Sequence, residues 1–152
     1  GDEVILGFLN DDPRDPVVLG MMNSSAKPAP FTASDDNHEK GFVTRSEMKV
    51  MFNDDKKSIR LETPGGNVIT LSDDAGSVVI EDQNSNKIEM ASGGITIESA
   101  ADINIKASGN LTIEGTNVNA KANGQFKAEG SAGAEMSTSA IAVVKGSLVQ
   151  IN

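Results

Sequence analysis

The feature that most constrains this chain is a regular spacing of apolar residue pairs in its C-terminal half. From residue 88 onward, two apolar residues separated by one other residue recur after seven or eight positions, and any three consecutive steps span 23 residues. A fixed period of this size is typical of solenoid-like folds built from short strands and corners. The spacing therefore predicts a three-sided β-winding, with one strand and one corner on each side.

Each pair is expected to point both of its side chains to one side of a strand, while the residue between them points away. Eight of the nine intervening residues are polar, which predicts one dry and one wet face. The candidate core consists of the large apolar members of these pairs: Ile88, Met90, Ile95, Ile97, Ile103, Ile105, Leu111, Ile113, Val118, Phe126, Met136, Ile141, Val143, Val149 and Ile151.

Some of the inward positions are small, among them Ala120, Ala128 and Ala134. Burying a full Ile or Leu contributes roughly 1.5–3 kcal/mol and an alanine much less, whereas ordering each residue costs roughly 1–2 kcal/mol. A single chain wound in this way would have a poorly filled centre, and three copies sharing one axis would fill it. The predicted fold is therefore all-β, with an intertwined homotrimeric three-sided β-helix, or prism.

The N-terminal part has a different composition. All five prolines lie within the first 64 residues, and 11 of the 15 glycines lie from Gly65 onward. Two strands, Glu3–Leu9 and Val17–Met21, are predicted around an Asp-, Asn- and Pro-rich turn at residues 10–16. Since two strands are marginal alone, this hairpin is expected to be the end of a small barrel, and the sequence a fragment of a longer chain.

Four further apolar pairs precede the winding and predict strands with one buried face. They are Val50/Phe52, Ile59/Leu61, Ile69/Leu71 and Val78/Ile80. The expected organisation is a barrel end at residues 1–30, a linker at 31–47, neck strands at 48–84 and a needle at 85–152 with its tip at 148–152.

The composition excludes several classes of function. The chain has 22 acidic and 13 basic residues, which gives a net charge of -9. This negative charge argues against nucleic acid as a partner. The absence of cysteine excludes disulfides and thiol chemistry. Asp35, Asp36, His38 and Glu39 lack the spacing of a calcium or zinc site, and the Asp pairs at 54–55 and 73–74 fit turns. No catalytic residue, metal site or cofactor is predicted.

Several segments resemble one family. Gly1-Asp-Glu-Val-Ile-Leu-Gly-Phe-Leu-Asn10 and Asp15-Pro-Val-Val-Leu-Gly20 resemble the end of the OB-fold barrel in VgrG-type spike proteins of type VI secretion and contractile injection systems. Lys40-Gly-Phe-Val-Thr-Arg-Ser46, Ile59-Arg-Leu-Glu-Thr-Pro-Gly-Gly-Asn67 and the Ile-Thr-Ile and Ile-Asn-Ile octads resemble the neck and needle that follow it. The plan is similar to that of the central spike of contractile-tailed phages.

The resemblance implies a non-enzymatic, membrane-puncturing homotrimer. It implies a PAAR-repeat tip protein docked at Gln150, Ile151 and Asn152, contacts with tube and baseplate proteins through an N-terminal base that is missing here, and possible effectors. With no signal-peptide pattern, assembly is expected in the bacterial cytoplasm, followed by ejection to the extracellular space or a target cell. The alternatives are a single-chain β-solenoid, acting as an adhesin or carbohydrate-active enzyme, and a phage tail-fibre shaft.

Overall fold

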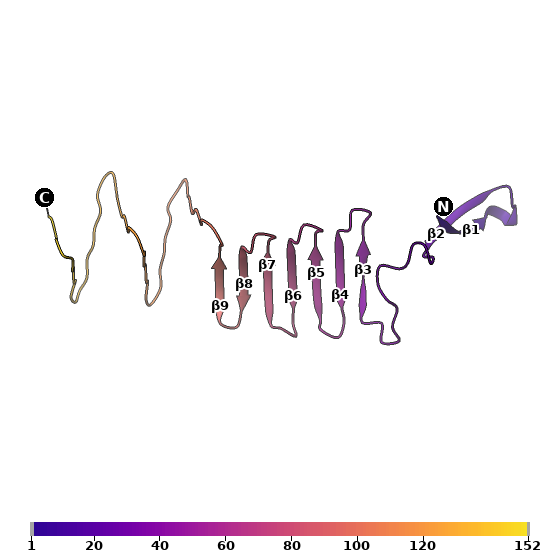
Figure 1. Cartoon of the computed structure of the whole chain (residues 1–152), viewed down its shortest axis with the longest axis horizontal. Helices are drawn as coiled ribbons and strands as arrows, with labels where there is room; N and C mark the ends of the chain where they lie inside the picture. The colour runs from indigo at the N-terminus through magenta and orange to yellow at the C-terminus, as the bar shows by residue number, and fades with distance from the viewer. Residues whose placement is uncertain (1, 152) are drawn as a thin grey trace. The chain divides into compact units, whose positions relative to one another are not determined.

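The computed structural model describes residues 2–151, and across these residues the protein is all-β, as predicted (Figure 1). Nine strands form two sheets, and the one short 3-10 turn is η1, Leu9–Asp11. The strands are β1 Glu3–Phe8, β2 Pro16–Met22, β3 Glu39–Val43, β4 Lys49–Asn53, β5 Ser58–Glu62, β6 Val68–Ser72, β7 Ser77–Glu81, β8 Lys87–Ala91 and β9 Gly94–Glu98. No helix in this part of the chain has the length and apolar character that crossing a membrane requires.

The N-terminal hairpin is confirmed. β1 and β2 pair antiparallel with an irregularity between Ile5 and Leu6. Their connection lies in the predicted turn, where the Asp12 carboxylate accepts hydrogen bonds from the backbone and side chain of Arg14 at 2.7–3.0 Å. These bonds hold the pKa of Asp12 below its ordinary value. The apolar side chains of this two-stranded sheet remain exposed.

The second sheet is an antiparallel meander in which seven strands pair in chain order, β3 to β9. The predicted apolar pairs at residues 50–80 lie on β4 to β7. β3 lies inside the segment expected to be a linker, where the sequence shows no apolar pair. It is a strand because its backbone pairs with β4, with Phe42 opposite Val50.

The meander is built from a hairpin that repeats every 19 residues. β3, β5 and β7 begin at residues 39, 58 and 77, and β4, β6 and β8 begin at 49, 68 and 87. The loops after β3, β5 and β7 share one geometry. In the loop after β5, the backbone N–H of Asn67 donates to Thr63 Oγ1 at 3.2 Å, and Gly66 has a positive φ of 91°. The alternation of nine- and ten-residue steps between apolar pairs is the sequence signal of this repeat.

The meander continues past residue 85, where the sequence analysis places the start of the needle. Ile88/Met90 and Ile95/Ile97, the first two pairs of the 23-residue pattern, lie on β8 and β9. The connection between these strands consists of Ser92 and Gly93 alone, which is too short for anything but a tight antiparallel hairpin.

Residues 102–151 contain no hydrogen-bonded strand. The chain there runs in stretches interrupted by bends at residues 108–109, 116, 123–124, 131–132, 139–140 and 147. Each bend falls between two successive apolar pairs, at a predicted corner. The described chain divides into two units between Ile105 and Lys106.

Candidate trimer interface

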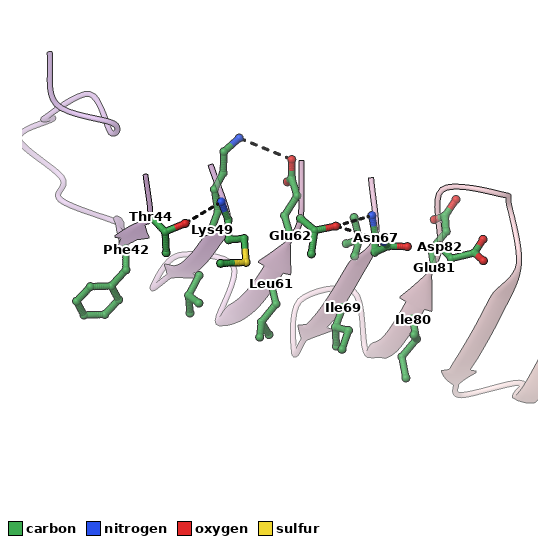
Figure 2. Close-up of a pocket in the computed structure, with 14 residues that line it drawn as sticks. Phe42, Thr44, Lys49, Leu61, Glu62, Asn67, Ile69, Ile80, Glu81 and Asp82 are labelled. Atoms are coloured by element: carbon green, nitrogen blue, oxygen red, sulfur yellow. Dashed lines mark hydrogen bonds and ion pairs between the residues drawn. The ribbon is translucent and has the colours of Figure 1, made fainter. Parts of the chain in front are cut away.

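The seven-stranded sheet has one face lined by two continuous rows of apolar side chains. Cross-strand neighbours in the register build both rows. The first row consists of Phe42, Val50, Leu61, Ile69, Ile80, Ile88 and Ile97, and the second of Phe52, Ile59, Leu71, Val78, Met90 and Ile95. Figure 2 shows Phe42, Leu61, Ile69 and Ile80 pointing to the same side of the strands. We call this surface the apolar face.

No layer of the described chain covers the apolar face. Its Ile, Leu and Met side chains on β5 to β8, such as Ile59, Leu71 and Ile88, are still 37–41% exposed, although each has apolar neighbours on both adjacent strands. No described residue anywhere in the chain is buried. A sheet normally packs its apolar face against another element, so this face lacks its counterpart in the single chain.

The total accessible surface leads to the same conclusion. The chain exposes 13773 Å², whereas a compact monomer of its mass, 15.8 kDa, is expected to expose about 7,300 Å². The chain therefore exposes nearly twice the surface of a folded monomer of its size. The single chain buries too little surface to offset the conformational entropy that is lost when its residues become ordered. The fold therefore depends on association with other chains.

The apolar face carries a hollow along its first row. The hollow has a volume of about 530 Å³ and is lined by Val50, Leu61, Ile69 and Ile80 together with Phe42. Thr44, Thr63 and Asp82, the first residues of the three similar loops, form its border. Because the surface that the hollow exposes is almost entirely apolar, the hollow is suited to receive apolar side chains of another chain and offers little for polar chemistry.

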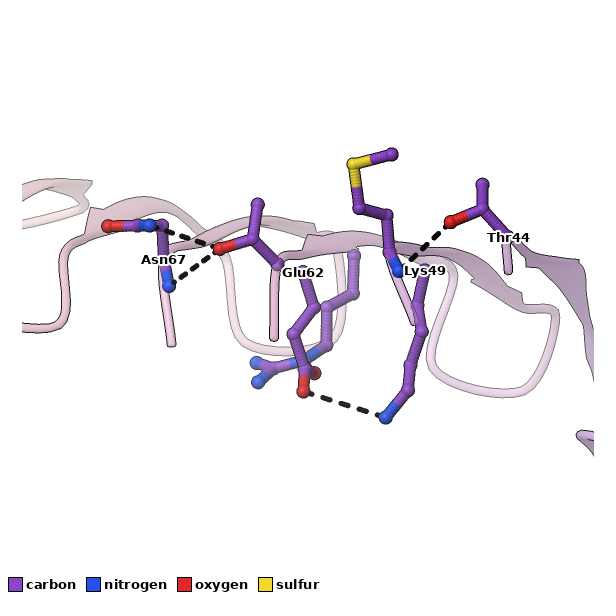
Figure 3. A network of polar contacts seen from close by, with 7 residues as sticks. Thr44, Lys49, Glu62 and Asn67 are labelled. Atoms are coloured by element: carbon purple, nitrogen blue, oxygen red, sulfur yellow. Dashed lines mark hydrogen bonds and ion pairs between the residues drawn. The ribbon is translucent and has the colours of Figure 1, made fainter. Parts of the chain in front are cut away.

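The opposite face carries charged side chains that pair with one another. Glu62 lies 3.1 Å from Arg60 Nε and 3.7 Å from Lys49 Nζ (Figure 3). The hydrogen bond from Arg60, with a smaller contribution from the charge of Lys49, holds the pKa of Glu62 below its ordinary value. Lys87 and Glu89 form a further pair at 2.6 Å, whose hydrogen bond raises the pKa of Lys87. These pairs give the charged side chains of this face partners within the sheet itself.

The candidate core residues beyond Glu98 lie on the stretches between bends, and all of them are exposed in the single chain. Ile103, Ile105, Leu111, Ile113, Val118, Phe126, Met136, Ile141, Val143, Val149 and Ile151 share this environment. The predicted trimer core leaves out the part of the apolar face on β3 to β7, although the pairs on β4 to β7 are predicted to have one buried face. The signal that could have added them is the regular step of nine or ten residues from Val50 through Ile59, Ile69 and Val78 to Ile88, which joins these pairs to the first predicted core pair.

The three predicted docking residues lie at the end of the chain. Gln150 and Ile151 are exposed, Ile151 to 90%, and Asn152 lies outside the described residues. Ile151 thus presents an apolar side chain at the last described position.

The aspartates singled out in the sequence belong to turns, whereas Glu39 begins β3. Asp54 follows β4 and pairs with Lys40, whose hydrogen bond and charge lower the Asp54 pKa, the opposite of what a general acid needs. Asp73 and Asp74 lie in the turn between β6 and β7, where their backbone N–H groups donate to the carbonyls of Lys57 and Lys56 at 3.2 and 3.4 Å. Within residues 2–151 no three His, Asp or Glu side chains gather as metal ligands.

The comparisons with known proteins agree with an interface built for association. No curated protein matches the chain. The family model described as phage baseplate V C-terminal trimerisation domain matches residues 58–152, a range that starts at β5 and includes all later strands and bends. That family supports a structural role in a baseplate or spike and assembly as a homotrimer. The chain therefore belongs to the phage baseplate V C-terminal trimerisation domain family.

Proposed function

We propose that this chain forms the shaft of a trimeric, non-enzymatic spike of a contractile injection apparatus of the VgrG type. The observation that carries the proposal is the uncovered apolar face, which continues into bends and apolar pairs at a 23-residue period. A homotrimer gives each of these surfaces a partner without requiring a second kind of protein.

The proposed arrangement has two parts. In the first, three copies of the meander place their apolar faces around one axis, and their charged faces remain outside. In the second, residues from about 102 onward wind around the same axis, so that strands of the three chains alternate on each side. Residues 1–30 would form the end of an OB-fold and residues 31–47 the connection to the neck. The neck and needle would meet near residue 85 or, as the meander indicates, near Glu98.

This arrangement fits a shaft that transmits axial force. Strands lying across the axis direct their backbone hydrogen bonds along it, and adjacent strands are about 4.7–4.9 Å apart. A closed prism leaves no free sheet edge along its sides. With three copies the charge would be about -27, three times the -9 of one chain, which favours solubility over fibre formation.

A single-chain solenoid would need successive stretches of one chain to pair with each other. In residues 102–151 these stretches form no β-ladder with one another. Aromatic residues, which a sugar-binding groove would need, make up only 3% of the chain. The trimeric shaft therefore accounts for more of the structure.

The blunt C-terminal end would carry a PAAR-type tip protein. A partner presenting backbone groups would add to the trimer at Gln150, Ile151 and Asn152 by strand-like pairing. The proposed course is assembly in the bacterial cytoplasm followed by ejection to the extracellular space or a target cell. Tube and baseplate proteins and any effectors would bind through parts outside this sequence.

Two measurements test the proposal. Light scattering on the purified chain should give a native mass of three copies at micromolar concentration, and a monomer would overturn the shaft. Deleting residues 149–152 should leave the trimer intact but abolish co-purification with a PAAR-repeat protein. Unchanged capture of that protein would refute docking at Gln150, Ile151 and Asn152 while leaving the trimer in place.

A further inference from the structure

The segment between the two sheets contains one large apolar side chain, and that side chain is partly covered. Residues 23–38 are otherwise polar, small or proline, and only Phe31 is large and apolar. The other four phenylalanines, Phe8, Phe42, Phe52 and Phe126, are 38–73% exposed, whereas Phe31 is half-buried. A flexible polar linker would leave such a ring in water, so a contact within the chain covers Phe31.

The contact is with the charged face of the meander, which lies opposite the apolar face, at β3 and β4. A Cβ placed on Gly41 would lie 2.8 Å from Cζ of Phe31 and 3.2 Å from the Cα of Met51. The ring therefore approaches the backbone of β3 at a position that has no side chain. Gly41 and Met51 are partners in the register, and both lie opposite the apolar face because side chains alternate along a strand. Phe31, Met51 and Arg60 also line a hollow of about 160 Å³.

The segment is held at further points before and after Phe31. Before it, Ser24 and Lys27 exchange two backbone hydrogen bonds of 2.9 and 3.1 Å, which close a turn. The side chain of Lys27 forms an ion pair with Asp2, the residue before β1. After it, the carbonyl of His38 accepts a hydrogen bond from the backbone N–H of Asp54 at 3.0 Å. Residues 23–38 are therefore attached to the rest of the chain at three places.

Two prolines come immediately before the covered ring. Pro28 and Pro30 each fix one backbone dihedral angle, which reduces the conformational freedom of the unattached segment. Ordering residues 28–31 therefore costs less conformational entropy than ordering the same length of a glycine- or serine-rich linker. One aromatic contact is then enough to hold this stretch against the sheet.

We propose that residues 23–38 form a strap, which Phe31 fastens to the charged face of β3 and β4 in its own chain and which couples the N-terminal hairpin to the shaft. The docking of Phe31 does not depend on the trimer, because every contact that supports it lies within one chain. The coupling role rests on the proposed function. In the proposed trimer the charged faces remain outside, so docking of the strap and association of the apolar faces do not compete.

The chain contains no tryptophan and no tyrosine, so a single introduced indole reports its own surroundings. The test variant is Phe31→Trp, because the hollow beside Phe31 leaves room for the larger ring. The matched control is Ala29→Trp, two residues earlier in the strap, where the side chain is exposed. The indole at position 31 should emit at shorter wavelength and be quenched by acrylamide several times less than the indole at position 29. Equal emission and equal quenching would overturn the docking.

A second measurement uses the natural strap and keeps the test independent of whether an indole fits. A protease specific for acidic residues can cut at Asp35 and Asp36, which are exposed and close to Phe31. Partial burial of a phenylalanine corresponds to about a tenfold change in an equilibrium. Phe31→Ala should therefore raise the initial rate of cleavage at these two sites about tenfold, whereas the matched control Thr32→Ala should leave it unchanged.

Mass spectrometry of the fragments identifies the sites that are cut. Unchanged cleavage in Phe31→Ala would overturn the strap, and so would an equal acceleration at every acidic site, because Phe31 would then stabilise the whole fold. Light scattering on the same samples separates this proposal from the proposed function. A native monomer with a protected indole at position 31 refutes the trimer alone, whereas a native trimer with an unprotected indole refutes only the strap.

Discussion

Replacing Ile105 with Asp should prevent trimer formation if Ile105 faces the axis. Ile105 is 68% exposed in the single chain, so the substitution costs the isolated chain little. Full burial of an Ile side chain contributes roughly 1.5–3 kcal/mol. The exposed part therefore accounts for about 1–2 kcal/mol per copy, and about 3–6 kcal/mol for three copies, that the trimer would lose.

The introduced charges add a larger penalty. Three carboxylates about 6 Å apart around an axis repel by about 3 kcal/mol per pair at an effective dielectric constant near 20, and each also loses hydration. The combined cost exceeds about 10 kcal/mol, which lowers the association constant by about seven orders of magnitude. Ile105→Asp should therefore be a monomer at concentrations where the wild-type chain is a trimer.

The matched control is Asn104→Asp, which adds the same charge at the adjacent position on the opposite side of the strand. Light scattering coupled to size exclusion should give a trimer for Asn104→Asp and a monomer for Ile105→Asp at the same micromolar concentration. If both variants are trimers with equal thermal midpoints, Ile105 does not face the axis, and the assignment of the inward positions from the apolar pattern is wrong.

Two further predictions concern the meander. A side chain at Gly41 would place its Cβ 2.3 Å from the carbonyl oxygen of Val50. Gly41→Ala should therefore lower the free energy of unfolding by about 1–3 kcal/mol per chain, and with it the thermal midpoint. At Gly20 an added Cβ meets nothing within 4 Å, so Gly20→Ala should leave the thermal midpoint unchanged. Equal thermal midpoints for the two variants would contradict the close packing at Gly41. Hydrogen bonds from Asn86 lower the pKa of Asp82 from 3.8 to about 2. This stabilisation is present above pH 3.8 and is lost as the pH falls through about 2. Thermal melts should therefore show Asp82→Asn less stable than wild type at pH 7, with a difference that shrinks as the pH falls from 3.8 to about 2. A constant difference would refute this role.

The 19-residue and 23-residue repeats are two ways of building a surface that is apolar on one side and polar on the other. In the 19-residue repeat, each strand finds its partner within its own chain, so three chains would contribute three separate sheets. In the proposed winding of the 23-residue repeat, successive stretches would be displaced around the axis and would leave gaps for other chains. Both place an apolar pair and an outward polar residue at each level, which would let one continuous interior pass from one part to the other.

The sequence by itself determined the local structure of this protein. Apolar pairs at spacing two predict strands such as β5 and β7, and Asp- and Gly-rich segments such as residues 73–76 predict the turns between them. The corners at Gly109 and Gly124 coincide with bends in the structure. These features depend on the preferences of each residue and its near neighbours along the chain, so they can be inferred without knowing the partner of any strand.

Only the tertiary structure decided which strands pair. Ile95/Ile97 has the same pattern as Ile103/Ile105, yet β9 pairs with β8 and residues 103–105 pair with nothing in their own chain. Likewise, β3 has Phe42 and Val43 side by side instead of an apolar pair at spacing two, and its strand exists because β4 lies beside it. An apolar pair specifies that one face of a strand must be covered, but it does not specify which chain covers it. Backbone hydrogen bonds are the same for every partner strand. The length of the loop between two strands therefore decides whether they pair within one chain.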